Sequence, residues 1–272
     1  MGRFLDLFAG MSSGQKLAWV FVCLTLFWVL EGAVPLVRFE YAKWKHARVN
    51  FFFLATSLLI NASFTAATAG LYVWAELHGV GLLRLVAWPL WVELLLAVLA
   101  LDFMAQWFAH YLLHRVKWMW KLHLVHHSDT HVDATTGTRH HPGDYVVREL
   151  FSLVTVLVCG IPLAAYVFYR IVTIFFTYFT HANIAVPAWI DRPLSWVFVT
   201  PNMHKFHHHV ERPWTDSNFG NVFSIWDRLF GTLVYDDPRS VRYGVDTLAG
   251  RPDEDIAYQL KVPFDGSIKT DY

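Results

Sequence analysis

Three closely spaced groups of histidines are the residues of this 272-residue chain best suited to chemistry. Within each group the spacing of three or four residues places imidazoles on one face of a helix, where they can bind one ion. The groups are His110 and His114; His123, His126 and His127; and His204, His207 and His208. One such pair is weak evidence, because a lone histidine is more often capped or solvated. Two copies of an HxxHH pattern and one of HxxxH predict a metal site, and a pH-sensing cluster is the alternative.

The number of histidines bears on the kind of metal. Thirteen of the 15 fall between His110 and His209. Imidazole suits zinc, copper, iron or nickel, whereas structural zinc sites usually include cysteine. Cys23 and Cys159 both lie in apolar runs instead. About eight to ten histidines are too many for one ion and suit two. A dinuclear site with open positions for oxygen fits iron, although spacing alone leaves zinc and manganese open.

A stripe of polar residues precedes the first histidine group in the sequence. Counting back from His110 by fours gives Gln106 and Asp102, so these side chains share one face of an otherwise apolar helix. A carboxylate inside a membrane span is expensive and by default indicates function.

The elements that must position these histidines are membrane helices. Hydrophobic residues make up 55% of the chain, charged residues 16%, and the mean hydropathy is +0.35. A span needs about 20 apolar helical residues. Four regions qualify: Leu17–Val37, Val49–Trp74, Leu85–Tyr111 and Leu150–Thr180. Pro162 should break the last one, which predicts a tight helical hairpin or two half-depth helices.

Lysine and arginine in the connections predict the orientation of the chain. They are frequent in Arg38–Arg48 and Arg115–Arg148, and only Arg84 lies in Ala75–Arg84. We therefore expect the histidines at the cytoplasmic face and the N-terminus outside. The first apolar stretch is too long for a cleaved signal peptide, and no A-x-A-like site follows it. Lys+Arg equals Asp+Glu at 22 each, so nucleic acid is not an expected partner.

The motifs together resemble the sterol desaturase/fatty acid hydroxylase superfamily. Their amino-acid sequences are most similar to those of its bacterial members. They cover about Asp102–Thr232, almost half the chain. They are HYLLH (110–114), HLVHH (123–127), RHHP (139–142), THAN (180–183), TPNMHKFHH (200–208), TDSNFG (215–220) and WDRLFGT (226–232).

The resemblance implies a non-haem di-iron centre that uses O2 and a two-electron donor. Carried over by position, nine ligands are His110, His114, His123, His126, His127, His181, His204, His207 and His208. His141 fills the family's HP position and is the expected tenth. His140 and His209 stand beside matched positions as spare residues, and His131 is either exposed or close to a ligand. Where the family often has HPxE, this chain has Asp144, which leaves the role of that acid open.

Metal-bound histidines usually donate their second N–H to a carboxylate or carbonyl. The residues expected in this supporting role are Asp102, Gln106, Asp133, Asp144, Asn218 and Asp227. Asp227 with Arg228 could equally form a structural ion pair, and Asn218-Phe219-Gly220 could be a plain turn.

The expected fold is all-α. It is a polytopic membrane bundle of about four spans, the last a broken hairpin, under a cytoplasmic helical cap. One domain, 1–272, holds membrane helices in 17–111 and 150–180 and the cap in 112–149 and 181–272. The tail should add a short strand or two around Thr232–Val245.

The expected activity is hydroxylation or desaturation of an unactivated C–H bond of a membrane lipid: a fatty acyl chain, a sphingoid base or a sterol. We expect the bacterial inner membrane as the location. No flavin, haem or four-cysteine motif is visible, so electrons should come from a separate protein. The resemblance implies a cytochrome b5-like or ferredoxin-like donor linked to NAD(P)H.

The alternatives are a histidine-rich metal transporter or sensor and a zinc-dependent membrane hydrolase. A transporter would need a path of His or acidic residues, and Glu31 is the only such residue within the predicted spans before Glu93. A hydrolase would need an acid beside the ligands, which none of the three groups has.

Overall fold

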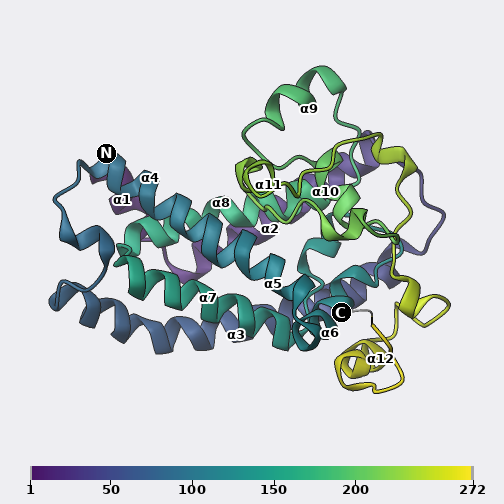
Figure 1. Ribbon diagram of the computed structural model, residues 1–272, viewed down its shortest axis with the longest axis horizontal. Coiled ribbons are helices and arrows are strands. Elements are labelled where there is room, and N and C mark those ends of the chain that lie inside the picture. Colours follow the sequence, from purple (N-terminus) through teal and green to yellow (C-terminus); the bar gives the residue numbers. More distant parts are fainter. Residues whose placement is uncertain (1, 271–272) are drawn as a thin grey trace.

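The computed structural model describes residues 2–270, which form helices, turns and loops (Figure 1). The long helices are α2 (Ser13–Ala33), α3 (Lys43–Leu77), α7 (Pro142–Cys159) and α8 (Leu163–His181). Another runs from α4 (Leu90–Leu101) through a π-helical segment (Asp102–Phe108) into α5 (Ala109–Arg115). The shorter ones are α1 (Gly2–Ala9), α6 (Lys117–His127), α9 (Ala188–Leu194), α10 (Pro201–His207), α11 (Ile225–Leu229) and α12 (Ile256–Lys261).

The remaining elements are 3₁₀ turns. They are Leu82–Leu85, Ala134–Thr138, Trp214–Asp216, Pro238–Ser240, Asp246–Leu248 and Val262–Phe264. The strand prediction for Thr232–Val245 is wrong, because no strand occurs within residues 2–270. That segment makes only an isolated bridge, between His209 and Tyr243. The expected all-α class is confirmed.

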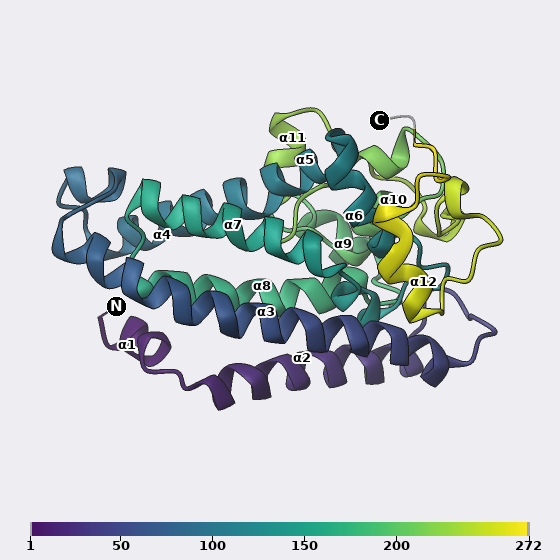
Figure 2. The same cartoon turned by 90° about the horizontal axis from the view of Figure 1, so that it is seen from below.

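Four helices are long and apolar enough to cross a membrane, as expected. They are Ser13–Ala33, Lys43–Leu85, Leu90–Arg115 and Leu163–His181. Figure 2 shows these helices running along the long axis of the molecule, with α6, α10 and α12 gathered at one end. The histidine motifs lie at that end.

The fourth apolar region forms the hairpin rather than two half-depth helices. Helix α7 ends at Gly160, whose φ of 67° is the left-handed conformation that glycine adopts freely. Pro162 then precedes the first residue of α8. A Cβ on Gly81 would lie 2.1 Å from the amide nitrogen of Gly160, so the loop after α3 closes directly on this turn. The chain therefore reverses direction between α7 and α8, so that α8 ends on the side of the bundle where α7 begins.

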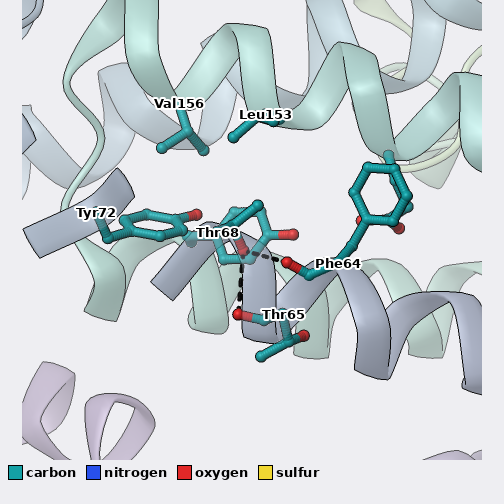
Figure 3. Close-up of a pocket in the computed structure, with 8 residues that line it drawn as sticks. Phe64, Thr65, Thr68, Tyr72, Leu153 and Val156 are labelled. Atoms are coloured by element: carbon teal, nitrogen blue, oxygen red, sulfur yellow. Dashed lines mark hydrogen bonds between the residues drawn. The ribbon is translucent and has the colours of Figure 1, made fainter. Parts of the chain in front are cut away.

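Arg170 and Glu149 form an ion pair inside the bundle. Arg170 Nη1 lies 2.8 Å from Glu149 Oε1, and Arg170 Nη2 donates to the hydroxyl of Tyr145 at 3.0 Å. Beside this pair, α3 and α7 enclose a cavity of about 10 Å³ between Thr68, Tyr72 and other side chains (Figure 3). That volume is about one water molecule, so the cavity cannot accept a lipid chain.

The π-helical segment changes the predicted polar stripe. The Asp102 carboxylate accepts hydrogen bonds from the Tyr169 hydroxyl at 2.7 Å and Trp226 Nε1 at 2.8 Å. It also accepts the backbone N–H of Phe223. Asp102 thus joins the third span to α8 and α11, and the structure does not bring it to the histidines. Gln106 Oε1 accepts from Asn221 Nδ2 at 3.4 Å.

Candidate metal centre

Nine of the ten histidines expected to bind metal form two buried groups. In each group the ligand nitrogens all lie within 4.8 Å of one another. The group of five is His110, His114, His123, His127 and His207, and the group of four is His126, His181, His204 and His208.

The two HxxHH motifs divide between the groups in mirrored fashion. On α6, His123 and His127 belong to the group of five, while His126 points to the group of four. On and just after α10, His204 and His208 belong to the group of four, while His207 joins the group of five. Helix α5 adds its pair His110 and His114 to the group of five, and the last residue of α8, His181, completes the other. The i, i+4 spacing decides this division, because those residues share a helix face.

In the group of five, protein oxygens fix the tautomers of four imidazoles. His110 Nδ1 donates to the carbonyl of Phe219 at 2.9 Å, and His207 Nδ1 donates to the carbonyl of Ser217 at 2.8 Å. His123 Nδ1 lies 2.8 Å from Asp144 Oδ2, and His114 Nδ1 lies 3.3 Å from Asp216 Oδ1. Carbonyl and carboxylate oxygens only accept, so each Nδ1 carries the proton. Each Nε2 is then an available lone pair.

Those lone pairs face one another. His110 Nε2 and His123 Nε2 lie 3.0 Å apart, and neither has a proton to share if both rings are neutral. Nitrogens bound to one ion at about 2.1 Å with angles of about 90–109° lie about 3.0–3.4 Å apart. The Nε2 atoms of His114 and His207 are buried and have no hydrogen-bond partner in the described part of the chain. The arrangement fits a cation at the centre of the group.

The group of four shows the same convergence with fewer outer contacts. His181 Nδ1 donates to the carbonyl of Thr177 at 2.7 Å. Its Nε2 lies 3.2 Å from His126 Nε2 and 3.0 Å from His204 Nε2. Within residues 2–270, Nδ1 of His126, Nδ1 of His204 and both ring nitrogens of His208 have no hydrogen-bond partner.

Burial keeps these imidazoles neutral. It lowers the pKa of His123 to about 4, despite Asp144, and lowers the pKa of His207 to about 3. The pKa values of His126, His127, His204 and His208 also lie well below the ordinary value, chiefly because of burial. Neutral imidazole is the form that binds metal. The nine nitrogen donors therefore fit two transition-metal ions, with four or five ligands each.

Asp144, whose role the sequence left open, contacts His123 and Arg148. Burial would raise the pKa of its carboxyl, but Arg148, His123 and His140 lower it well below the ordinary range. Arg148 Nε donates a hydrogen bond to Asp144 Oδ1 at 2.9 Å, and Asp144 Oδ2 accepts a hydrogen bond from His123 Nδ1. The ionised acid thus orients His123, as metal-site carboxylates commonly do.

Asn218 and Asp227 act one step further from the metal groups. Asn218 has a φ of 51°, a left-handed conformation that Asn tolerates, and its Nδ2 donates to the carbonyls of Met203 and Val234, both at 2.8 Å. Asp227 accepts the backbone N–H groups of Phe219 and Gly220, both at 2.9 Å, and Trp107 Nε1. Together they hold the loop that presents the carbonyls of Ser217 and Phe219 to His207 and His110. Arg228 donates to the carbonyl of Ser195.

The structure does not bring His141 to either group. Its Nδ1 accepts the backbone N–H of Gly143 at 3.1 Å, so His141 is the N-cap of α7. The capping role accounts for one ring nitrogen of His141, and a tenth ligand at this position stays a prediction. The neighbouring His140, expected to be spare, lies 3.1 Å from Asp144 Oδ2 and stacks on His126 with ring centroids 4.5 Å apart. His123, His140 and Asp144 form a third, smaller set of potential ligands.

Other supporting residues were missed or placed differently. Asp216, in the TDSNFG motif, was not predicted to support a ligand, but its Oδ1 lies 3.3 Å from His114 Nδ1. Lys205 is fully buried, and its Nζ donates to the carbonyl of His181. Glu31 Oε1 accepts the backbone N–H groups of Ala134 and Asn183, which joins the first span to the residues after His181. Asp133, expected near a ligand, accepts the Tyr41 hydroxyl at 2.6 Å and caps the turn Ala134–Thr138.

Fold and site together define an all-helical protein with candidate membrane spans and two adjoining groups of buried histidines. A family model described as fatty acid hydroxylase matches residues 94–232. The chain belongs to this fatty acid hydroxylase family.

Several curated proteins are similar to this chain. Ornithine lipid hydroxylase OlsE of Rhizobium tropici is 27% identical over 177 residues, which are 65% of this chain and 52% of that protein. Alkylglycerol monooxygenase of Xenopus tropicalis is 29% identical over 64% of this chain and 37% of that protein. The Homo sapiens alkylglycerol monooxygenase is 29% identical over 55% of this chain and 32% of that protein. The aligned parts thus span about half of these relatives or less. No solved structure matches the chain.

Proposed function

We propose that the protein is a membrane di-iron oxygenase that hydroxylates an unactivated C–H bond of a lipid. The observation that carries the proposal is the convergence of imidazole nitrogens in two adjoining buried groups, with no proton to share between His110 Nε2 and His123 Nε2. The family and the activities that the relatives are named for, those of a lipid hydroxylase and of monooxygenases, support the same reaction. The stoichiometry is R–H + O2 + 2e⁻ + 2H⁺ → R–OH + H2O.

Nine histidines would hold the two ions, five in one group and four in the other. Iron bound there would supply the activation of O2 that no side chain can provide. The chain's own residues do the positioning. Asp144, Asp216 and the carbonyls of Ser217 and Phe219 fix four tautomers, so that Nε2 of each ring faces the centre.

Exclusion of water is the second contribution of the chain. All nine imidazoles are at most 6% exposed, so the reaction would take place away from bulk solvent. Because His110, His114 and His181 lie near the ends of membrane-type helices, the centre would lie where a lipid chain can leave the apolar part of the bundle. Electrons would come from a separate cytochrome b5-like or ferredoxin-like protein at the cytoplasmic face.

We propose as substrate a membrane lipid that has both a polar head and an alkyl or acyl chain. Ornithine lipid and alkylglycerol, for which the relatives are named, share that chemistry. We propose hydroxylation rather than desaturation, because a hydroxylase and a monooxygenase both insert oxygen.

The test is incubation of the expressed protein with its membrane lipids, an electron-donor system and ¹⁸O2, followed by mass spectrometry of the lipids. We expect one ¹⁸O atom in the product, and none in the variants His126→Ala and His207→Ala. His78→Ala is the matched control, because His78 is exposed just after α3 and is far from both groups in the sequence. Absence of labelled lipid from the unmodified protein, or activity retained in both variants, would overturn the proposal.

Metal analysis separates this proposal from the two other classes. A di-iron oxygenase should contain two irons per chain. A zinc-dependent hydrolase should contain one zinc, and a transporter or sensor should bind metal weakly and exchangeably. Either of the last two results would contradict the di-iron assignment even before any lipid is tested.

A further inference from the structure

Two segments outside the candidate spans, residues 189–197 and 225–230, expose apolar side chains. Nine large apolar side chains are exposed among residues 116–149 and 182–270, and seven of them lie in these two segments. We call these seven the apolar lip: Trp189, Ile190, Trp196, Val197, Ile225, Leu229 and Phe230. Trp118 and Phe264 are the other two. Such clustering marks an interaction surface, whereas scattered apolar residues need no explanation.

The apolar lip is continuous with the membrane-type helices. The ring of Phe230 stacks on Trp107 at 4.5 Å and on Phe103 at 5.6 Å, both in the third candidate span. Phe198, next to Val197, stacks on Phe176 of α8 at 5.4 Å. Helix α11 contacts the π-helical segment of the third candidate span through Trp226, which packs against Phe103, so it lies along the flank of the bundle rather than beyond its end, as Figure 2 shows. The exposed side chains therefore extend the apolar surface of the spans toward the histidine end.

The accessible charged side chains in the two segments are all basic. Asp191 and Asp227 are buried and held by hydrogen bonds from the hydroxyls of Tyr235 and Thr232. Arg192 is exposed, and the partly exposed Arg228 lies over the ring of Trp196 at 4.3 Å. The accessible charges of the segments are thus two arginines. Tryptophan with arginine beside aliphatic side chains is typical of the membrane–water interface.

We propose that the apolar lip lies in the headgroup layer of the bilayer, where its apolar side chains enter the lipid and its arginines contact anionic phospholipid. This layer is the depth at which Trp and Arg are most favourable, since the aromatic ring is partly dehydrated and the guanidinium meets phosphate. The lip is joined to the centre through Asp227, which holds the loop that positions His110. The proposal requires the membrane setting but not the reaction proposed above.

Depth measurements by spin labelling test the position. In a Cys23→Ala, Cys159→Ala background, nitroxides are attached at Trp189→Cys and Leu229→Cys in the full chain. Phe264→Cys is the matched control, because Trp189 and Phe264 are each 77% exposed. The proteins are placed in nanodiscs of phosphatidylcholine with phosphatidylglycerol. Power saturation then compares access of O2, which concentrates in lipid, with access of a neutral nickel chelate, which stays in water.

We expect labels at 189 and 229 to be more accessible to O2 than to the chelate, and the label at 264 to show the reverse. Chelate access at 189 and 229 equal to that at 264 would place the lip in water and overturn the proposal. Protection from both reagents, with dipolar broadening between copies, would also overturn it by showing that a second copy of the chain covers the lip.

The contact with anionic lipid is tested by removing phosphatidylglycerol. We expect the O2-to-chelate ratio at 189 to fall at least twofold in pure phosphatidylcholine, and Arg192→Gln with Arg228→Gln to abolish that difference. An unchanged ratio would overturn the anionic-lipid contact. Iron content and oxygenase activity are not read in these measurements, so failure of the proposed reaction would not alter their outcome.

Discussion

The two histidine groups are similar in how they are assembled but differ in how firmly their rings are held. Each takes an i, i+4 pair from one HxxHH motif and the remaining histidine from the other. In the group of five, four rings donate Nδ1–H to protein oxygens. In the group of four, only His181 has such a bond among the described residues, while His126, His204 and His208 have ring nitrogens without partners.

This difference suggests a division of labour between the two groups. Rings fixed through a second hydrogen bond keep an ion in one geometry. Rings without that bond can move with less energetic cost, and four ligands leave one more coordination position than five. We therefore expect exogenous ligands to bind at the group of four, and the group of five to act as the more rigid half.

Removal of one ligand from each group should give the largest effects. We expect His204→Ala and His127→Ala each to lower product formation by more than about 100-fold, since loss of an outer partner alone typically costs about 10–100-fold. Iron content should distinguish them. His204→Ala leaves three histidines and should lose one iron per chain, whereas His127→Ala leaves four and should retain more. Elemental analysis with His78→Ala as control measures the iron content of each variant. Greater iron loss in His127→Ala than in His204→Ala would contradict this expectation.

Loss of the outer partner of His123 should have the next largest effect. Asp144→Ala leaves His123 Nδ1 without its acceptor, so iron affinity or activity should fall about 10–100-fold. Asp144→Asn can still present an amide oxygen to Nδ1 and should retain part of the affinity. Chelator competition measures the affinity of both variants. Unchanged affinity in Asp144→Ala would show that the group of five does not depend on this bond.

Stability of the metal-free protein should depend on pH through the buried histidines. The folded protein holds the pKa of His123 at about 4 and of His207 at about 3, below the ordinary value of 6.5. Between about pH 6.5 and 4 the unfolded chain binds more protons, so the free energy of unfolding rises with pH and falls on acidification. Each such histidine contributes up to about 1.4 kcal/mol per pH unit.

Thermal unfolding of chelator-treated protein between about pH 7 and 4 measures this dependence. His207→Ala should reduce its slope, while His78→Ala should leave it unchanged. A midpoint that does not fall on acidification would mean that the rings in the metal-free protein are not held neutral.

Residue spacing predicted the features that depend on local geometry. The four candidate spans, the break at Gly160-Ile161-Pro162 and the placement of each HxxHH motif on a helix or at its end follow from hydropathy and helical periodicity. The group that each i, i+4 pair joins does not follow from spacing, because it depends on how α6 and α10 face each other.

Backbone partners left no signal in the sequence. The carbonyls of Ser217 and Phe219 accept from His207 and His110, but any residue has a carbonyl. The π-helical segment likewise shifted Asp102 away from the stripe that a regular helix predicts. Asp216 could have been found, since an acid within a recognised motif is a natural partner for a metal-bound imidazole.

The smallest effect should separate His141 from the two groups. Its ring is the N-cap of α7, and loss of such a cap costs about 0.5–2 kcal/mol. His141→Ala should therefore lower the midpoint of thermal unfolding by a few degrees without changing iron content, and His141→Asn, which can also cap a helix, should restore the midpoint. Thermal unfolding with elemental analysis measures both quantities. Loss of iron at an unchanged midpoint would instead place His141 among the ligands, because the cap alone does not contact either group.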